Sequence, residues 1–102
     1  MIETFAEEAD LEVRRKRARM RAWRRGMREM DLILGGFIDS HGETLDANRL
    51  DSFEALLARR DQDLYAWISG RGLESFTDAT EAETALLCEI AENWRSIDKN
   101  LP

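Results

Sequence analysis

The residues of this sequence that could do chemistry are few and far apart. His41 is the only histidine and Cys88 the only cysteine. A nucleophilic dyad needs two such side chains within hydrogen-bond reach, but His41 lies in a predicted loop beside Gly42 and Cys88 lies far along the chain. We expect a solvated His41 and a small, buried Cys88. The sequence has no phosphate-binding loop, dinucleotide fingerprint or metal-ligand cluster, and we expect no enzymatic activity.

The most distinctive spacing is that of Arg25, Gly26 and Glu29, at the start of an apolar helical stripe. Glycine can cap a helix, and Glu29 would then stand at the third helical position, where its carboxylate can bond a free backbone N–H and interact favourably with the helix dipole. A purely structural role in capping the helix would thus explain both Gly26 and Glu29. The capping role does not explain Arg25, whose guanidinium would be free at the turn. An exposed ion pair between Arg25 and Glu29 would contribute only ~0–1 kcal/mol.

Charge is unevenly distributed along the chain. The formal net charge is -6, yet residues 14–28 contain nine basic side chains and no acidic one. Such a run could bind nucleic acid, or it could dock on an acidic protein surface. The remaining sequence is acidic, no zinc-finger or RNA-binding motif is present, and Trp23 is the only aromatic residue within the run. We favour a protein surface and keep a nucleic-acid-binding helical module as the alternative.

The elements that must position these residues are predicted to be helices. Apolar residues recur at three- and four-residue steps, and no segment shows the alternation of a half-buried strand. The pattern predicts an all-α fold of five helices. The first covers about 10–24 with a thin apolar side, and the second begins near Gly26.

Capping residues mark where the later helices begin and end. Asp46 is predicted to cap the third helix and Asp61 a short fourth. Glycines in the segment 69–72 should end the fourth. Thr80 and Glu83 have the spacing of a capping box at the start of the fifth.

Short connections between these segments favour antiparallel packing of consecutive helices. We therefore expect a compact five-helix bundle, mostly antiparallel with short loops, formed as one domain by residues 13–98. Residues 1–12 would be an acidic leader that need not be ordered, and 99–102 a C-terminal tail. The apolar stripes predict one core that contains Met30, Leu34, Phe37, Phe53, Leu57, Leu87, Ile90 and Trp94.

Composition also bears on the compartment. A single cysteine cannot form an intramolecular disulfide, which fits a reducing environment. No apolar run approaches the ~20 residues that span a bilayer, and the acidic first dozen residues argue against a secretory signal or a transit peptide. We expect a bacterial cytoplasmic protein without membrane insertion, and a mitochondrial matrix location only if a presequence has been removed.

Two signatures suggest a family. The first has the pattern R-x-W-x-R-G-x-x-E-x-D over residues 21–31 and continues as LGGF at 34–37. The second is DQDLYAWISGRG at 61–72. Together they resemble the succinate dehydrogenase assembly factor family, small proteins that promote covalent attachment of FAD to the flavoprotein subunit. The match covers roughly residues 19–97 in the expected order, with Gln62 where the family usually has proline.

The resemblance implies a five-helix bundle that holds no cofactor stably and acts on FAD attachment in its partner. That partner would be the flavoprotein subunit of succinate dehydrogenase, with the fumarate reductase subunit as a second candidate. Matching positions imply partner-binding roles for the R-G-x-x-E segment, and the Arg25 guanidinium would be free because it faces the partner. We expect a monomer that binds no nucleic acid. The predicted partner-binding residues are Arg21, Arg24, Arg25, Gly26, Glu29 and Asp31.

Overall fold

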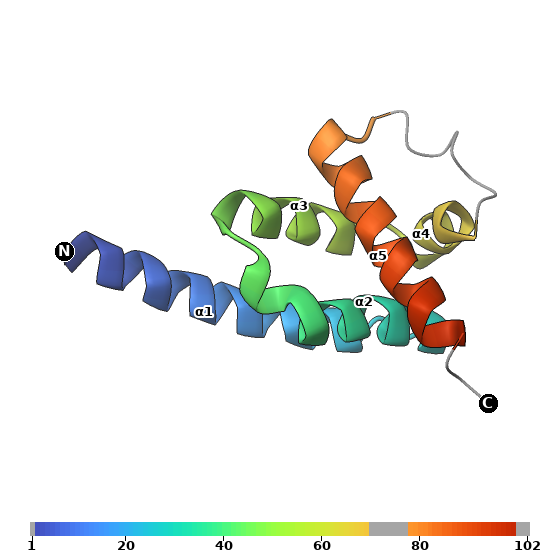
Figure 1. Cartoon of the computed structure of the whole chain (residues 1–102), viewed down its shortest axis with the longest axis horizontal. Coiled ribbons are helices and arrows are strands. Elements are labelled where there is room, and N and C mark those ends of the chain that lie inside the picture. The colour runs from blue at the N-terminus through green and yellow to red at the C-terminus, as the bar shows by residue number, and fades with distance from the viewer. Residues whose placement is uncertain (1, 70–77, 100–102) are drawn as a thin grey trace.

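The computed structural model describes residues 2–69 and 78–99, with the side chains of residues 10–69 and 78–97. This part of the chain forms five α-helices and a 3₁₀ turn, without a strand (Figure 1). The all-α, five-helix prediction is confirmed. The elements are α1 (Ile2–Trp23), α2 (Arg28–His41), η1 (Gly42–Thr44), α3 (Ala47–Leu57), α4 (Asp61–Ile68) and α5 (Glu81–Lys99).

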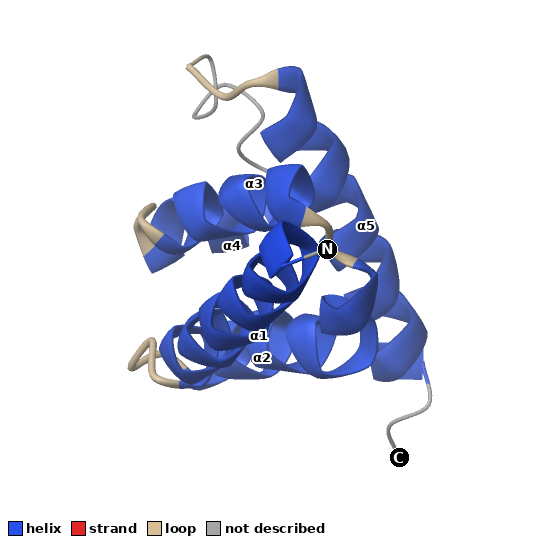
Figure 2. Ribbon diagram, turned by 90° about the vertical axis from the view of Figure 1, so that its left-hand side faces the viewer, coloured by secondary structure: helices blue, strands red, loops and turns tan. Residues whose placement is uncertain are grey.

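The helix packing centres on α1 and α5, since α1 contacts α2 and α3 while α5 contacts α2, α3 and α4. Figure 1 shows α1 and α2 running antiparallel along one side of the molecule, with α3 above them. The fifth helix crosses α3 and α2 obliquely and also contacts α4. Figure 2, turned by 90°, separates the α1–α2 pair from α3 and α4 and shows α5 alongside both. The antiparallel packing predicted for neighbours is therefore clearest between α1 and α2.

The first helix is longer than the sequence pattern predicted. It begins at Ile2 instead of near Asp10, so residues 2–12 continue the helix. This segment contains no glycine or proline, and acidic residues near a helix N-terminus interact favourably with the helix dipole. Among the described helices, none is long and apolar enough to cross a membrane.

The predicted caps are confirmed in part. The Asp46 carboxylate accepts a hydrogen bond from the backbone N–H of Arg49 at 2.9 Å, and the Thr80 hydroxyl accepts one from the N–H of Glu83 at 3.1 Å. The prediction for Asp61 is wrong, because Asp61 is the first residue of α4 and its side chain caps nothing. The fourth helix ends at Ile68, and the predicted glycine stop lies outside the described residues.

The predicted core is also confirmed. Seven of its eight members are buried, and Trp94 is partly buried against them. The sequence pattern missed the contribution of α1, whose thin apolar side buries Ala18 and Ala22 completely against the rest of the core. Small side chains at these positions allow the backbones of α1 and α2 to approach closely.

Close packing of α1 on α2 also explains one glycine of the LGGF segment. A Cβ added at Gly35 would lie 2.4 Å from ring atoms of Trp23, much closer than a real contact allows. The indole Nε1 of Trp23 donates a hydrogen bond to Asp39 at 3.2 Å. Trp23 at the end of α1 is thus fitted onto the middle of α2, immediately before the turn that joins the two helices.

Ion pairs connect the helices around this core. Arg14 on α1 donates to Asp51 at 2.5 Å and to Glu54 at 2.7 Å on α3. These hydrogen bonds, Glu54 first, raise the pKa of the Arg14 guanidinium. At the end of α3, burial disfavours the charged form of Arg59, but its bonds to Glu83 and Asp78 outweigh that effect and raise the pKa. Both guanidinium groups therefore stay charged and cross-link neighbouring helices.

Candidate protein-binding site

The Arg-Gly pair lies in the turn between α1 and α2. Gly26 has φ of 94°, a left-handed conformation that no other described residue adopts and that glycine adopts without steric cost. The residue that caps α2 is Met27, in extended conformation and without a side-chain hydrogen bond. The prediction that Gly26 caps α2 is therefore wrong. A Cβ at Gly26 would meet no atom within 4 Å, so lack of space does not require glycine here. The turn needs glycine for its left-handed backbone conformation.

The two acidic residues of the first signature have different environments. Asp31 accepts a hydrogen bond from the backbone N–H of Arg25 at 2.7 Å, which closes the turn. Glu29 is in the first turn of α2 and exposed, and it makes no hydrogen bond or ion pair with any described side chain. The predicted capping role of Glu29 is therefore wrong, because Asp31 is the acidic residue that accepts a backbone N–H at this turn. Glu29 remains available to another molecule.

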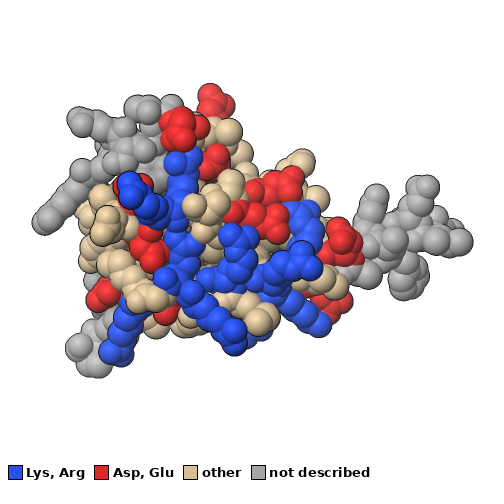
Figure 3. Space-filling model, turned by 180° about the vertical axis from the view of Figure 1, so that it is seen from behind, with Lys and Arg blue, Asp and Glu red and all other residues tan. Residues whose placement is uncertain are grey.

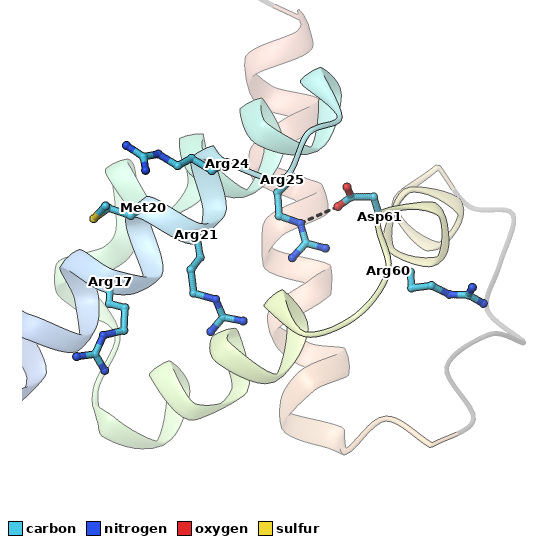
Figure 4. Close-up of a pocket in the computed structure, with 7 residues that line it drawn as sticks. All are labelled: Arg17, Met20, Arg21, Arg24, Arg25, Arg60 and Asp61. Atoms are coloured by element: carbon cyan, nitrogen blue, oxygen red, sulfur yellow. Dashed lines mark hydrogen bonds and ion pairs between the residues drawn. The ribbon is translucent and has the colours of Figure 1, made fainter.

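The Arg25 side chain is directed into the protein. Its Nε donates to Asp61 at 2.7 Å, and its two terminal nitrogens donate to the backbone carbonyls of Leu57 and Arg59 (Figure 4). The side chain is only 11% exposed. The prediction of a free guanidinium is wrong.

These partners of Arg25 lie where α3 ends and α4 begins. The last carbonyls of a helix have no partner within that helix, and a cation is favourable beside them. The guanidinium satisfies Leu57 and Arg59 at the end of α3 and pairs with Asp61 at the start of α4. Arg25 therefore ties the α1–α2 turn to the α3–α4 corner and brings the two sequence signatures together.

A groove opens beside this connection (Figure 4). Its volume is about 640 Å³. Four of the residues that line it share one face of α1, because they follow the i, i+3, i+4, i+7 spacing of a helix. The α1 residues are Arg17, Met20, Arg21 and Arg24, and the α3–α4 corner and the turn add Arg25, Arg60 and Asp61.

Only part of the basic run is available for docking. Arg14, Arg15, Arg19 and Arg25 are engaged within the protein, and Lys16 faces Glu12 at 3.8 Å. Arg17, Arg21 and Arg24 are exposed and have no hydrogen bond or ion pair among the described side chains. Figure 3 shows the basic side chains gathered in a band on one face of the molecule.

The residues considered for catalysis do not form a site. His41 is partly buried and its ring stacks on Phe37, with ring centroids 4.9 Å apart. Cys88 on α5 is exposed. The predictions of a solvated His41 and a buried Cys88 are both wrong, because α2 continues through His41 in place of the predicted loop and Cys88 lies on an exposed side of α5. Within the described chain, no group of three or more potential ligands could hold a metal ion.

Comparisons with known proteins agree with the signatures. A family model described as "Flavinator of succinate dehydrogenase" matches residues 16–92. The FAD assembly factor SdhE of Acetobacter pasteurianus is 38% identical over 64 residues, which cover 63% of this chain and 59% of the relative. The FAD assembly factor SdhE of Legionella pneumophila strain Lens is 47% identical over 47 residues, 46% of this chain and 60% of the relative.

A mitochondrial relative is similar as well. The mitochondrial succinate dehydrogenase assembly factor 2 of Candida glabrata is 39% identical over 57 residues, 54% of this chain and 37% of the relative. The chain therefore spans less than two thirds of the length of each of these three relatives. No solved structure matches the chain.

Proposed function

Because the chain belongs to the family described as flavinators of succinate dehydrogenase, we propose that it is an assembly factor for that enzyme. It binds the flavoprotein subunit and promotes covalent attachment of FAD. The flavin chemistry belongs to the partner. The bound factor favours the conformation of the partner in which flavin and acceptor side chain are aligned, and such alignment accelerates bond formation.

The observation that carries this proposal is the exposed Glu29 carboxylate on a turn with fixed geometry. Arg25 and Asp31 hold the turn from within, while Glu29 has no internal role among the described side chains. Gly26 beside it is exposed and carries no side chain, so another backbone can approach closely there. A rigid turn that offers one carboxylate and open backbone fits recognition of a protein surface.

The proposed roles of the six predicted site residues therefore divide in two. Gly26, Glu29, Arg21 and Arg24 contact the flavoprotein. Arg25 and Asp31 are positioning residues, since their side chains bond to the α3–α4 corner and to the turn itself. This division explains why the signature contains residues that a partner does not reach.

Covalent flavinylation of the client subunit tests the proposal. We would incubate the apo flavoprotein subunit with FAD and with each variant, and measure in-gel flavin fluorescence of the denatured subunit. Glu29→Gln preserves side-chain size and removes the charge, so it should remain folded yet fail to promote flavinylation. The matched control is Glu92→Gln, which removes an exposed charge on α5 and should behave as wild type.

Two results would contradict the proposal at different levels. Normal flavinylation with Glu29→Gln would show that the turn is not the contact site. Normal flavinylation in a host that lacks this protein would show that the protein is not needed for flavinylation and would contradict the proposed function itself. The same assay with the fumarate reductase subunit would establish whether that subunit is a second client.

We also propose that the protein acts as a monomer in the bacterial cytoplasm and holds no cofactor of its own. Its relatives include bacterial and mitochondrial proteins, so fractionation of the host should decide the compartment. Light scattering after gel filtration should report the mass of one chain. The nucleic-acid alternative finds no support in the comparisons, and no aromatic side chain lines the basic groove for base stacking.

A further inference from the structure

We propose that the groove between α1 and the α3–α4 corner binds an extended acidic segment of the client protein. This inference rests on the proposed function and adds a second contact beside the Glu29 turn. It assigns Arg17 and Met20, together with Arg21 and Arg24, to one binding surface, hereafter the arginine groove. The occupant has carboxylates at alternate positions.

The charges of the arginine groove point to an anionic occupant. Elsewhere on α1, the cations are matched by carboxylates or a carbonyl of this chain: Arg14 by Asp51 and Glu54, Arg15 by Leu45, Arg19 by Asp39. On α1, the groove residues Arg17, Arg21 and Arg24 have no such match among the described side chains. Like charges on one face of a helix repel, and an anionic partner removes this repulsion.

The spacing of these arginines fits an extended peptide. A helix rises 1.5 Å per residue, so Arg17 and Arg21 are about 6 Å apart along α1 and Arg21 and Arg24 about 4.5 Å. Alternate side chains of an extended strand are roughly 6.6 Å apart on the same face. Long arginine side chains can absorb the difference, and each guanidinium can bond a carboxylate with two parallel hydrogen bonds.

An apolar side chain lies among the groove arginines. The side chain of Met20 is 54% exposed. Contact with the methylene groups of a bound peptide would remove this surface from water, which is favourable at roughly 25 cal/mol per Å². The arginine groove therefore combines charge with apolar contact and is more than a solvated basic face.

The same features favour a peptide over nucleic acid. Phosphate chains also have regular negative charge, but recognition of a single strand normally adds aromatic rings on which bases stack. The lining of the groove contains no such ring.

Fluorescence anisotropy can test this binding directly. The probe is a fluorescein-labelled peptide with the sequence Glu-Val-Glu-Val-Glu, compared with the same peptide in which glutamine replaces every glutamate. At low ionic strength, the glutamate peptide should bind the wild-type protein about tenfold more tightly than the glutamine peptide. Arg21→Gln should weaken binding about fivefold. Arg95→Gln, which removes an exposed charge on α5, should change the affinity by less than about twofold.

Several outcomes would overturn the inference. Equal weakening by Arg21→Gln and Arg95→Gln would mean that only overall charge matters. Equal binding of the two peptides would exclude carboxylate recognition, and tighter binding of oligothymidylate than of the glutamate peptide would identify the groove as a nucleic-acid site. If Arg21→Gln supports normal flavinylation while Glu29→Gln does not, the arginine groove is dispensable and the proposed function still stands.

Discussion

Replacement of Arg25 by alanine provides the sharpest test of the connection between the two turns. The guanidinium joins the α1–α2 turn to the carbonyls of Leu57 and Arg59 and to the Asp61 carboxylate. The substitution removes every one of these bonds and leaves their acceptors without a donor. A surface arginine would be replaced at almost no cost in stability. Arg25→Ala should therefore destabilise the fold substantially.

The magnitude follows from burial and charge. A hydrogen bond to a charged group contributes ~1.5–3 kcal/mol, and removal of one partner from a buried ion pair costs ~3–5 kcal/mol. Asp61 remains 21% exposed and stands at the start of α4, so water and the helix dipole compensate in part. We expect the free energy of unfolding to fall by about 3 kcal/mol. For a chain of this size, this corresponds to a Tm lower by about 14 °C.

Thermal unfolding followed by far-ultraviolet circular dichroism measures this change. The matched control is Arg24→Ala, because Arg24 is the adjacent arginine, is exposed and lacks a partner among the described side chains. Its free energy of unfolding should change by less than ~0.5 kcal/mol. If Arg25→Ala melts within about 2 °C of wild type, the guanidinium does not hold the two turns together in solution, and its role would return to direct contact with the partner.

The other predictions concern single contacts, each measured by urea unfolding. Gly35→Ala should cost ~1–3 kcal/mol because its Cβ meets the ring of Trp23; an equal cost in a Trp23→Ala background would contradict this cause. Gly26→Ala should cost ~1–2 kcal/mol through its left-handed backbone alone, and no loss would show that the turn can adopt another conformation. Asp46→Ala should cost ~0.5–2 kcal/mol through loss of the α3 cap, whereas an unchanged midpoint would mean that water replaces this hydrogen bond. Phe53→Ala should cost ~3–5 kcal/mol because its ring is fully buried, and a much smaller loss would mean that the core closes around the gap.

Sequence reasoning succeeded where the relevant interactions are local. The cap at Asp46 involves a backbone N–H only three residues away, so the local sequence is enough to predict it. The core stripe of Met30, Leu34 and Phe37 follows from the helical period of α2. The start of α1 was placed too late because its first residues are rich in acidic side chains and show little apolar periodicity in the sequence.

By itself, the sequence determined the all-α class, the phase of the core helices and the signatures that resemble the family. The tertiary structure alone decided how the signature residues are used. The acceptors of Arg25 lie 32 to 36 residues away, and two of them are backbone carbonyls whose availability depends on where α3 ends. No residue spacing in the sequence predicts where α3 ends, or that this end of α3 lies beside the α1–α2 turn. The same packing separates Arg25, bonded inside the protein, from Glu29, whose carboxylate remains exposed.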